Sequence, residues 1–147
     1  NAFFTFDVIT LQIAEETNNE LRFKAISGIG MTGKIGDLSM LHPKLNYENC
    51  LSVKAYIDNA VVYIPEVSSN MELSYIDKNI HEITACNSLI YVPLVVQNKE
   101  IGVIGFLSKK RMVITEKTMN TIRLQLSHIS LILRNAVLYG DLKHTST

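Results

Sequence analysis

The sequence has no tryptophan, only two cysteines, only three prolines and no net charge. Two cysteines, Cys50 and Cys86, are too few for the disulfide framework of a small secreted domain, so we expect reduced thiols and a cytoplasmic setting. Fourteen basic residues balance fourteen acidic ones, which leaves no long-range attraction for nucleic acid or an anionic membrane. No apolar run reaches the roughly 20 residues of a membrane span, and no signal peptide is visible. We therefore expect neither nucleic-acid binding nor direct membrane insertion.

Apolar residues, in contrast, are plentiful. They make up 47% of the 147 residues, which fits one globular domain with a proper core. The chain begins with Asn1 rather than methionine, and its first residues already have a strand-like pattern, so we expect a segment of a longer protein. We assign one domain to residues 1–142 and a polar tail or the start of a linker to residues 143–147.

Strand-like and helix-like patterns follow one another along the chain. Alternating polar and apolar residues predict strands, and prolines and glycines mark where they end. In chain order we expect a hairpin from residues 5–13 and 21–26, short helices on either side of Pro43 within 34–58, a strand at 60–64, and a loop leading into a helix over 69–84.

A second hairpin, over residues 91–107, is apolar on both faces. Placing its tip at Asn98 and Lys99 puts Tyr91 opposite Phe106, on the face that also carries Gly102, because side chains alternate with period two. Both faces must then be covered, by helices, a partner or a pocket. A glycine such as Gly102 within a strand indicates a close approach to the backbone.

A long helix is predicted over residues 115–142. One of its faces can lie on the sheet, since apolar residues recur along it at helical spacing. A second apolar stripe recurs every seven residues on the far side, which favours a parallel homodimer through this helix. The alternative is an N-terminal helix, outside this segment, that covers the second stripe. The sheet-facing residues are Ile122, Leu126, Ile129, Leu133 and Ala136, and the second stripe is Leu124, Leu131 and Leu138.

Three stretches resemble the GAF domain, a small-molecule sensor domain of signalling proteins. They are SLIYVPL at 88–94, EIGVIGFL at 100–107 and RNAVL at 134–138. The resemblance implies an α+β fold of the GAF/PAS type. It has a central antiparallel sheet, terminal helices packed on one face and a small-molecule pocket on the other. The second apolar face of the hairpin would then line that pocket.

The resemblance leaves the ligand unknown. Members that bind cyclic nucleotides have an Asn-Lys pair, a later Phe and an Asp-Glu pair. The corresponding positions here are Ser108-Lys109, Ile114 and Thr118-Met119, of which only the lysine matches.

Bilin and haem are both disfavoured as cofactors. Bilin-binding members have a cysteine directly before a histidine, whereas here Ile80 precedes His81 and Cys86 is displaced toward the strand. Haem needs an axial histidine, for which His81 is the one suitably placed candidate, and a lone histidine is more often an ordinary polar residue than a ligand. The four histidines are dispersed, which predicts no metal site.

The sequence favours a regulatory ligand-sensing domain of a sensor kinase or nucleotide cyclase, not an enzyme. One alternative is a dimerisation and scaffold module that binds no ligand. A further alternative is a free methionine sulfoxide reductase that uses Cys86 and Cys50, since such chemistry needs an attacking and a resolving thiol. Our candidate ligand-binding residues are Tyr63, Tyr75, His81, Asn87, Ser88, Tyr91 and Gly102.

Overall fold

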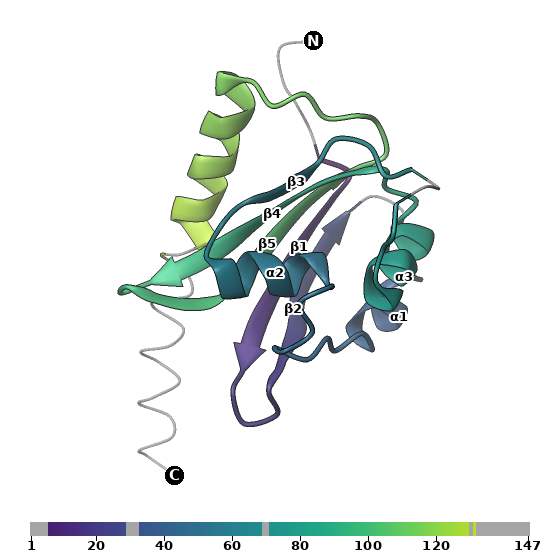
Figure 1. Cartoon of the computed structure of the whole chain (residues 1–147). Helices are drawn as coiled ribbons and strands as arrows, with labels where there is room; N and C mark the ends of the chain where they lie inside the picture. The colour runs from purple at the N-terminus through teal and green to yellow at the C-terminus, as the bar shows by residue number, and fades with distance from the viewer. Residues whose placement is uncertain (1–5, 29–32, 69–70, 130, 132–147) are drawn as a thin grey trace.

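A five-stranded antiparallel sheet forms the centre of the molecule (Figure 1). The structure is a computed structural model that describes residues 6–28, 33–68, 71–129 and 131. The strand order is β2-β1-β5-β4-β3, so the first and the last strands of the chain pair at the middle. The strands are β1 (Val8–Glu15), β2 (Glu20–Gly28), β3 (Val62–Ile64), β4 (Ser88–Val96) and β5 (Lys99–Ser108).

The hairpin of β1 and β2 confirms the prediction from the alternating pattern. The pairing skips one residue of β2, since Leu11 pairs with Ala25 and Gln12 pairs with Phe23. β1 itself is regular, and its side chains alternate between the two faces of the sheet. Because β5 pairs with the other edge of β1, this strand has a hydrogen-bonded neighbour on each side.

The hairpin of β4 and β5 forms as predicted, but with a different register. Its tip is Gln97 and Asn98, with φ of 53° and 65°, the left-handed pair that a tight two-residue hairpin turn requires. A bulge follows, because Leu94 pairs with Gly102 while Val95 pairs with Glu100.

The shifted register changes which residues of this hairpin face each other. Tyr91 consequently lies opposite Gly105, not opposite Phe106. Gly102 shares a face with Ile104 and Phe106, so the expectation that Tyr91 and Gly102 share a face was wrong.

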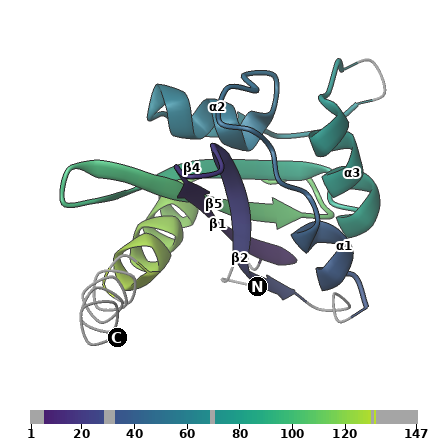
Figure 2. The ribbon, with the colours of Figure 1, turned by 90° about the horizontal axis from the view of Figure 1, so that it is seen from below.

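Three short helices cover one face of the sheet, which we call the α2/α3 face (Figure 2). A core of apolar side chains lies beneath them, among them Leu38, Val53, Ile80, Leu89 and Val103. The predicted short helices around Pro43 and the helix after residue 69 are thus confirmed. The helices are α1 (Ile35–Ser39), α2 (Leu51–Asp58) and α3 (Tyr75–Thr84).

A helix described over residues 116–129 and at residue 131 covers the opposite face, which we call the C-helix face (Figure 2). Thr115 caps it, since its Oγ1 accepts a hydrogen bond from the backbone N–H of Thr118 at 3.2 Å. The predicted stripe is confirmed where the structure describes it, because Ile122, Leu126 and Ile129 join the core of this face. Its other two members, Leu133 and Ala136, lie outside the described residues.

Candidate functional site

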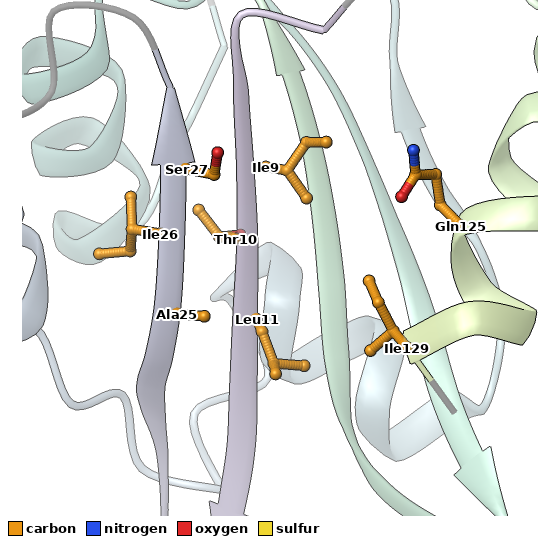
Figure 3. A pocket seen from close by; sticks show the side chains of 8 residues that line it. All are labelled: Ile9, Thr10, Leu11, Ala25, Ile26, Ser27, Gln125 and Ile129. Carbon is orange, nitrogen blue, oxygen red and sulfur yellow. The ribbon is translucent and has the colours of Figure 1, made fainter. Parts of the chain in front are cut away.

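Among the hollows formed by the described residues, two that lie on opposite faces of the sheet are considered as ligand sites. The larger of these two is a groove of about 360 Å³ on the C-helix face. Figure 3 shows it between the edge hairpin of β1 and β2 and the C-terminal helix, from which Gln125 and Ile129 project. Its other lining residues are Ile9, Thr10, Leu11, Ala25, Ile26 and Ser27. This groove is mostly apolar and offers few groups that could orient a polar ligand.

The smaller hollow is a cavity on the α2/α3 face with about 10 Å³ of free space. This volume is about that needed by one water-sized group. Polar and titratable side chains line it together with apolar ones, which is the composition of a recognition site. The lining residues are Leu51, Val67, Leu73, Asp77, Ile80, His81, Cys86, Leu89, Tyr91 and Leu107.

Asp77 is the charged residue of this cavity, and the start of α3 holds it in place. Ser74 caps the helix, and its Oγ accepts a hydrogen bond from the backbone N–H of Asp77 at 3.1 Å. Asp77 Oδ2 accepts two hydrogen bonds in turn, from Ser74 Oγ at 2.6 Å and from the backbone N–H of Leu51 at 3.0 Å. The second oxygen, Oδ1, is buried and has no hydrogen-bond partner within the described part of the chain.

Burial also sets the protonation of Asp77. The side chain is only 4% exposed, and this desolvation raises the pKa of its carboxyl, although the hydrogen bonds from Ser74 and Leu51 act in the opposite direction. The cavity therefore contains an acidic group that gains from any donor able to reach Oδ1.

Tyr91 and the two cysteines are neutral neighbours of Asp77. Burial raises the pKa of Tyr91 well above its ordinary value, and the nearby charge of Asp77 adds to the effect. Burial is likewise the main reason that the pKa values of Cys50 and Cys86 are raised. Both thiols are free and stay protonated, so neither has the thiolate character of a reactive cysteine.

His81 lines the same cavity, as predicted, and has a fixed orientation. Its Nδ1 lies 2.7 Å from the backbone oxygen of Cys86. Because a carbonyl only accepts, Nδ1 donates this hydrogen bond and Nε2 is the ring nitrogen without a proton in the neutral histidine. Within the described residues, no group of three or more histidine, cysteine or acidic side chains could hold a metal ion.

Two more buried polar side chains lie on the α2/α3 face. Thr10 is 2% exposed and Gln12 is fully buried, and the alternation of β1 directs both side chains to the α2/α3 face, although Thr10 also borders the groove on the C-helix face. A Cβ atom on Gly105 would lie 2.5 Å from Thr10 Oγ1 and 2.8 Å from Tyr91 Cε1, so Thr10 and Tyr91 are neighbours. Thr10 Oγ1 and both amide atoms of Gln12 lack a hydrogen-bond partner among the described residues.

Two predicted pocket residues lie on the C-helix face, away from this cavity. Tyr63 packs with the core of the C-helix face, where its hydroxyl donates to the backbone oxygen of Met112. Ser88 also holds the segment around Met112. Its Oγ accepts a hydrogen bond from the backbone N–H of Met112 at 3.0 Å and donates one to the backbone oxygen of Ile64 at 3.3 Å. Both side chains fasten the approach to the C-terminal helix instead of lining the cavity.

Three other predicted residues also lie outside this cavity. Tyr75 is 70% exposed on the outer side of α3. Asn87 is exposed, and its side-chain amide donates to the backbone oxygen of Lys109 at 3.3 Å. Gly102 lies against β1, where a Cβ atom would overlap the backbone oxygen of Gln12. Of the seven predicted residues, the structure brings only His81 and Tyr91 to the cavity.

The predicted dimer stripe is solvent-exposed where it is described. Leu124 is 73% exposed and Leu131 is 59% exposed, while Leu138 lies outside the described residues. The helix therefore presents apolar side chains that the described part of this chain does not cover.

Sequence reasoning missed Asp77, Thr10 and Gln12, although signals for them exist. Ser74 and Asp77 have the Ser-x-x-acid spacing that marks a helix start with reciprocal side-chain hydrogen bonds. Thr10 and Gln12 are the polar members of an alternating strand, and they become unusual only because that strand lies at the middle of the sheet.

No helix in the described part of the chain is long and apolar enough to cross a membrane.

Comparisons with known proteins support the fold alone. No family model matches this sequence, and neither does any curated protein. Among solved structures, the GAF domain of a two-component sensor histidine kinase from Bacillus halodurans is similar, with a TM-score of 0.73 and 17% identity over 93% of this chain and 87% of that one.

Two further solved structures share this architecture. The GAF domain of a phosphoenolpyruvate-protein phosphotransferase from Coxiella burnetii has a TM-score of 0.71 and 13% identity, over 92% of this chain and 76% of that one. A type II free methionine-R-sulfoxide reductase from Thermoplasma acidophilum has a TM-score of 0.63 and 18% identity, over 88% and 80%. The strand order, the helices on both faces and these likenesses confirm the resemblance seen in the sequence: the chain has the α+β fold of GAF domains.

Proposed function

We propose that this chain is a regulatory ligand-sensing domain of a larger cytoplasmic signalling protein, of the sensor kinase or nucleotide cyclase type. The observation that carries the proposal is the set of unpartnered polar atoms on the α2/α3 face, on Thr10, Gln12 and Asp77. A buried polar group without a partner costs about 1–3 kcal/mol, and a ligand that pairs with it recovers that cost. Of these residues, Asp77 lines the cavity, whereas Thr10 and Gln12 lie elsewhere on the same face and outside its lining.

The names of similar structures support the same class of function. The Bacillus halodurans domain belongs to a sensor histidine kinase, and another similar structure, with a TM-score of 0.67 and 20% identity, is part of a methyl-accepting chemotaxis protein. Two free cysteines are compatible with the reducing cytoplasm.

The effect of a ligand in the cavity would pass to the C-terminal helix through β4. Tyr91 lies on the cavity side of this strand, while Ile90 and Val92 pack on the C-helix face. Ser88, at the start of β4, holds Met112 on the segment that leads into the helix. A ligand alters the output only if it binds one arrangement of the helix better than the other.

We further propose that the output is read through a homodimer of the C-terminal helices, with Leu124, Leu131 and Leu138 at the seam. The exposure of Leu124 and Leu131 supports this contact, and the seven-residue spacing suits a parallel pair. Sedimentation equilibrium should find a dimer that Leu124→Glu turns into a monomer, while the neighbouring Arg123→Glu leaves it intact. A monomeric parent protein would contradict this part of the proposal.

Native mass spectrometry tests the sensing function. The mass of the gently ionised protein is compared with the mass of the denatured chain. An excess of up to a few hundred daltons per chain, reduced in the double variant Gln12→Met with Asp77→Asn, would support a ligand on the α2/α3 face. No excess, with no stabilisation of the fold by a panel of small metabolites, would instead favour the scaffold alternative, a dimerisation module without a ligand.

The structure gives less support to a reductase. The Thermoplasma acidophilum protein shows that this fold can carry such chemistry, and Cys86 does line the cavity here. An attacking sulfur must be a thiolate, however, and burial raises the pKa values of both Cys50 and Cys86. We therefore propose no catalytic step.

A further inference from the structure

We propose that the cavity on the α2/α3 face binds a small ligand through an ammonium head group, which donates to Asp77 Oδ1. This inference rests on the proposed sensing function and specifies the chemistry of the ligand. It also assigns to Asp77 the role of anchor residue.

The hydrogen bonds of Asp77 leave one oxygen for a ligand. Ser74 Oγ and the backbone N–H of Leu51 both donate to Oδ2, which holds this oxygen in place. Oδ1 is buried, with no partner in the described residues. An ionised carboxylate only accepts hydrogen bonds, so the group that completes this site is a donor.

The missing donor is best supplied as a cation. The cavity lining contains neither lysine nor arginine, and none of the ion pairs between described residues involves Asp77. His81 does not fill this role through Nδ1, because that nitrogen donates to the backbone oxygen of Cys86. A buried charge without a counter-charge is costly, and an ammonium group removes this cost as well as the missing hydrogen bond.

The size of the cavity limits the rest of the ligand. The free space of about 10 Å³ holds one group of the size of water, and an ammonium group is of that size. The remaining lining is largely aliphatic, from Val67, Leu73 and Ile80 on the helix and loop side to Leu89 and Leu107 on the strands. A short alkyl body therefore suits the site, provided that neighbouring side chains move aside for it.

Propylammonium, 1-propanol and propionate are matched probes of this proposal, because they share a short alkyl body and differ in head group. Each is titrated into the purified chain while the melting temperature is followed, with sodium chloride as the control for ionic strength. We expect propylammonium to raise the melting temperature by about 3 °C at ten times its Kd. 1-Propanol should have a much smaller effect, and propionate should have none.

Asp77→Asn tests the anchor. Asparagine retains an oxygen for the hydrogen bonds from Ser74 and Leu51 but places an N–H₂ group where Oδ1 was, so it should lower the affinity for propylammonium at least tenfold. Asp58→Asn, at the exposed end of α2, is the matched control and should bind as the parent does. Circular dichroism verifies that both variants are folded.

Three results would overturn the proposal. They are an equal or larger stabilisation by propionate or 1-propanol, no stabilisation by propylammonium, and unchanged affinity in a folded Asp77→Asn variant. The first two need no variant, so they apply even if Asp77→Asn does not fold. A co-purified ligand that lacks a nitrogen donor would sink the ammonium proposal and leave the sensing function standing, whereas no co-purified ligand together with no stabilisation by any tested small molecule would remove both.

Discussion

The two faces of the sheet are both buried, but by different kinds of side chain. On the C-helix face the described core is mostly apolar, with Ile90, Ile104 and Phe106 fully buried. The buried hydroxyls of Ser88 and Thr118 on this side have hydrogen-bond partners. On the α2/α3 face an apolar core of similar extent includes Thr10, Gln12 and Asp77, with polar atoms that nothing in the described chain satisfies. The buried polar groups Ser88 and Thr118 of the C-helix face thus have partners within the described chain, whereas Thr10, Gln12 and Asp77 of the α2/α3 face carry polar atoms that do not.

The largest loss of stability should come from a substitution on the C-helix face. Phe106 is fully buried and contacts the ring of Phe6 at a centroid distance of 4.8 Å, so Phe106→Ala should lower the free energy of unfolding by about 4 kcal/mol. Tyr91→Phe, on the other face, should change it by less than about 1 kcal/mol. Urea denaturation measures both, and similar losses in the two variants would refute the contrast between the faces.

Alanine substitutions at the two glycines of β5 compare the two faces directly, because Gly102 and Gly105 lie on opposite faces. Gly102→Ala should cost about 3 kcal/mol, because the new Cβ would overlap the backbone oxygen of Gln12, which the sheet holds in place. Gly105→Ala should cost less, about 2 kcal/mol, since the Cβ meets side-chain atoms of Thr10 and Tyr91 instead of backbone. Thermal unfolding of the two variants would contradict this ranking if Gly105→Ala were the less stable.

Replacing a polar residue of the α2/α3 face should stabilise the protein. Gln12→Met keeps the length of the side chain and removes two buried polar atoms without partners, so the free energy of unfolding should rise by about 1 kcal/mol. Thr10→Val makes the same change on a smaller scale, since it removes one such atom. If Gln12→Met is destabilising, then the amide has a partner, such as a buried water, that offsets its burial.

The smallest expected effect is the pH dependence of folding stability that Asp77 causes. Burial raises the pKa of Asp77 above its ordinary value of 3.8, so the folded protein holds this proton more tightly than the unfolded chain does. The resulting stability is fully present below the ordinary pKa and is lost as the pH rises through the raised pKa of the folded state. Cys50 and Tyr91 remain neutral there, because their pKa values are raised as well.

Asp77→Asn should remove this decline, and Asp58→Asn should not. Urea denaturation from about pH 4 to about pH 8 measures it. A parent protein whose stability rose over this range while Asp77→Asn stayed flat would show that Asp77 is stabilised as an anion in the folded state.

The fold could be predicted from the sequence because long patterns determine it. The apolar runs of residues 88–96 and 99–108 and the stripe of Ile122, Leu126 and Ile129 each depend on many residues, so an error at one position changes little. These patterns indicated two buried faces and a terminal helix on one of them, which the structure contains. They left open whether a further layer, a partner or a pocket covers the other face.

The site could not be predicted as well, because it depends on register. A slip by one residue exchanges the two faces of a strand, and Gln97 at a left-handed turn position, together with the bulge at Leu94 and Val95, gave no clear signal. Tyr63 is on a three-residue edge strand with every residue half-buried, a pattern that does not indicate a face. Asp77 is recognisable only when the contacts of Ser74 and Leu51 are known.

The pairing at the middle of the sheet has a consequence for how the chain acquires its structure. β1 pairs with β5, and the backbone N–H of Lys109 donates to Asp7 Oδ2 at 2.7 Å across 102 positions of sequence. Contacts between such distant segments form slowly, because a long loop must close before they contribute any energy. At a synthesis rate of about 5–20 residues per second, the first hairpin waits roughly 5–20 s on the ribosome for its central partner strand. During that interval the edge of β1 is open to other strands, so the yield of folded protein in the cell should depend on chaperones that protect the nascent amino-terminal hairpin.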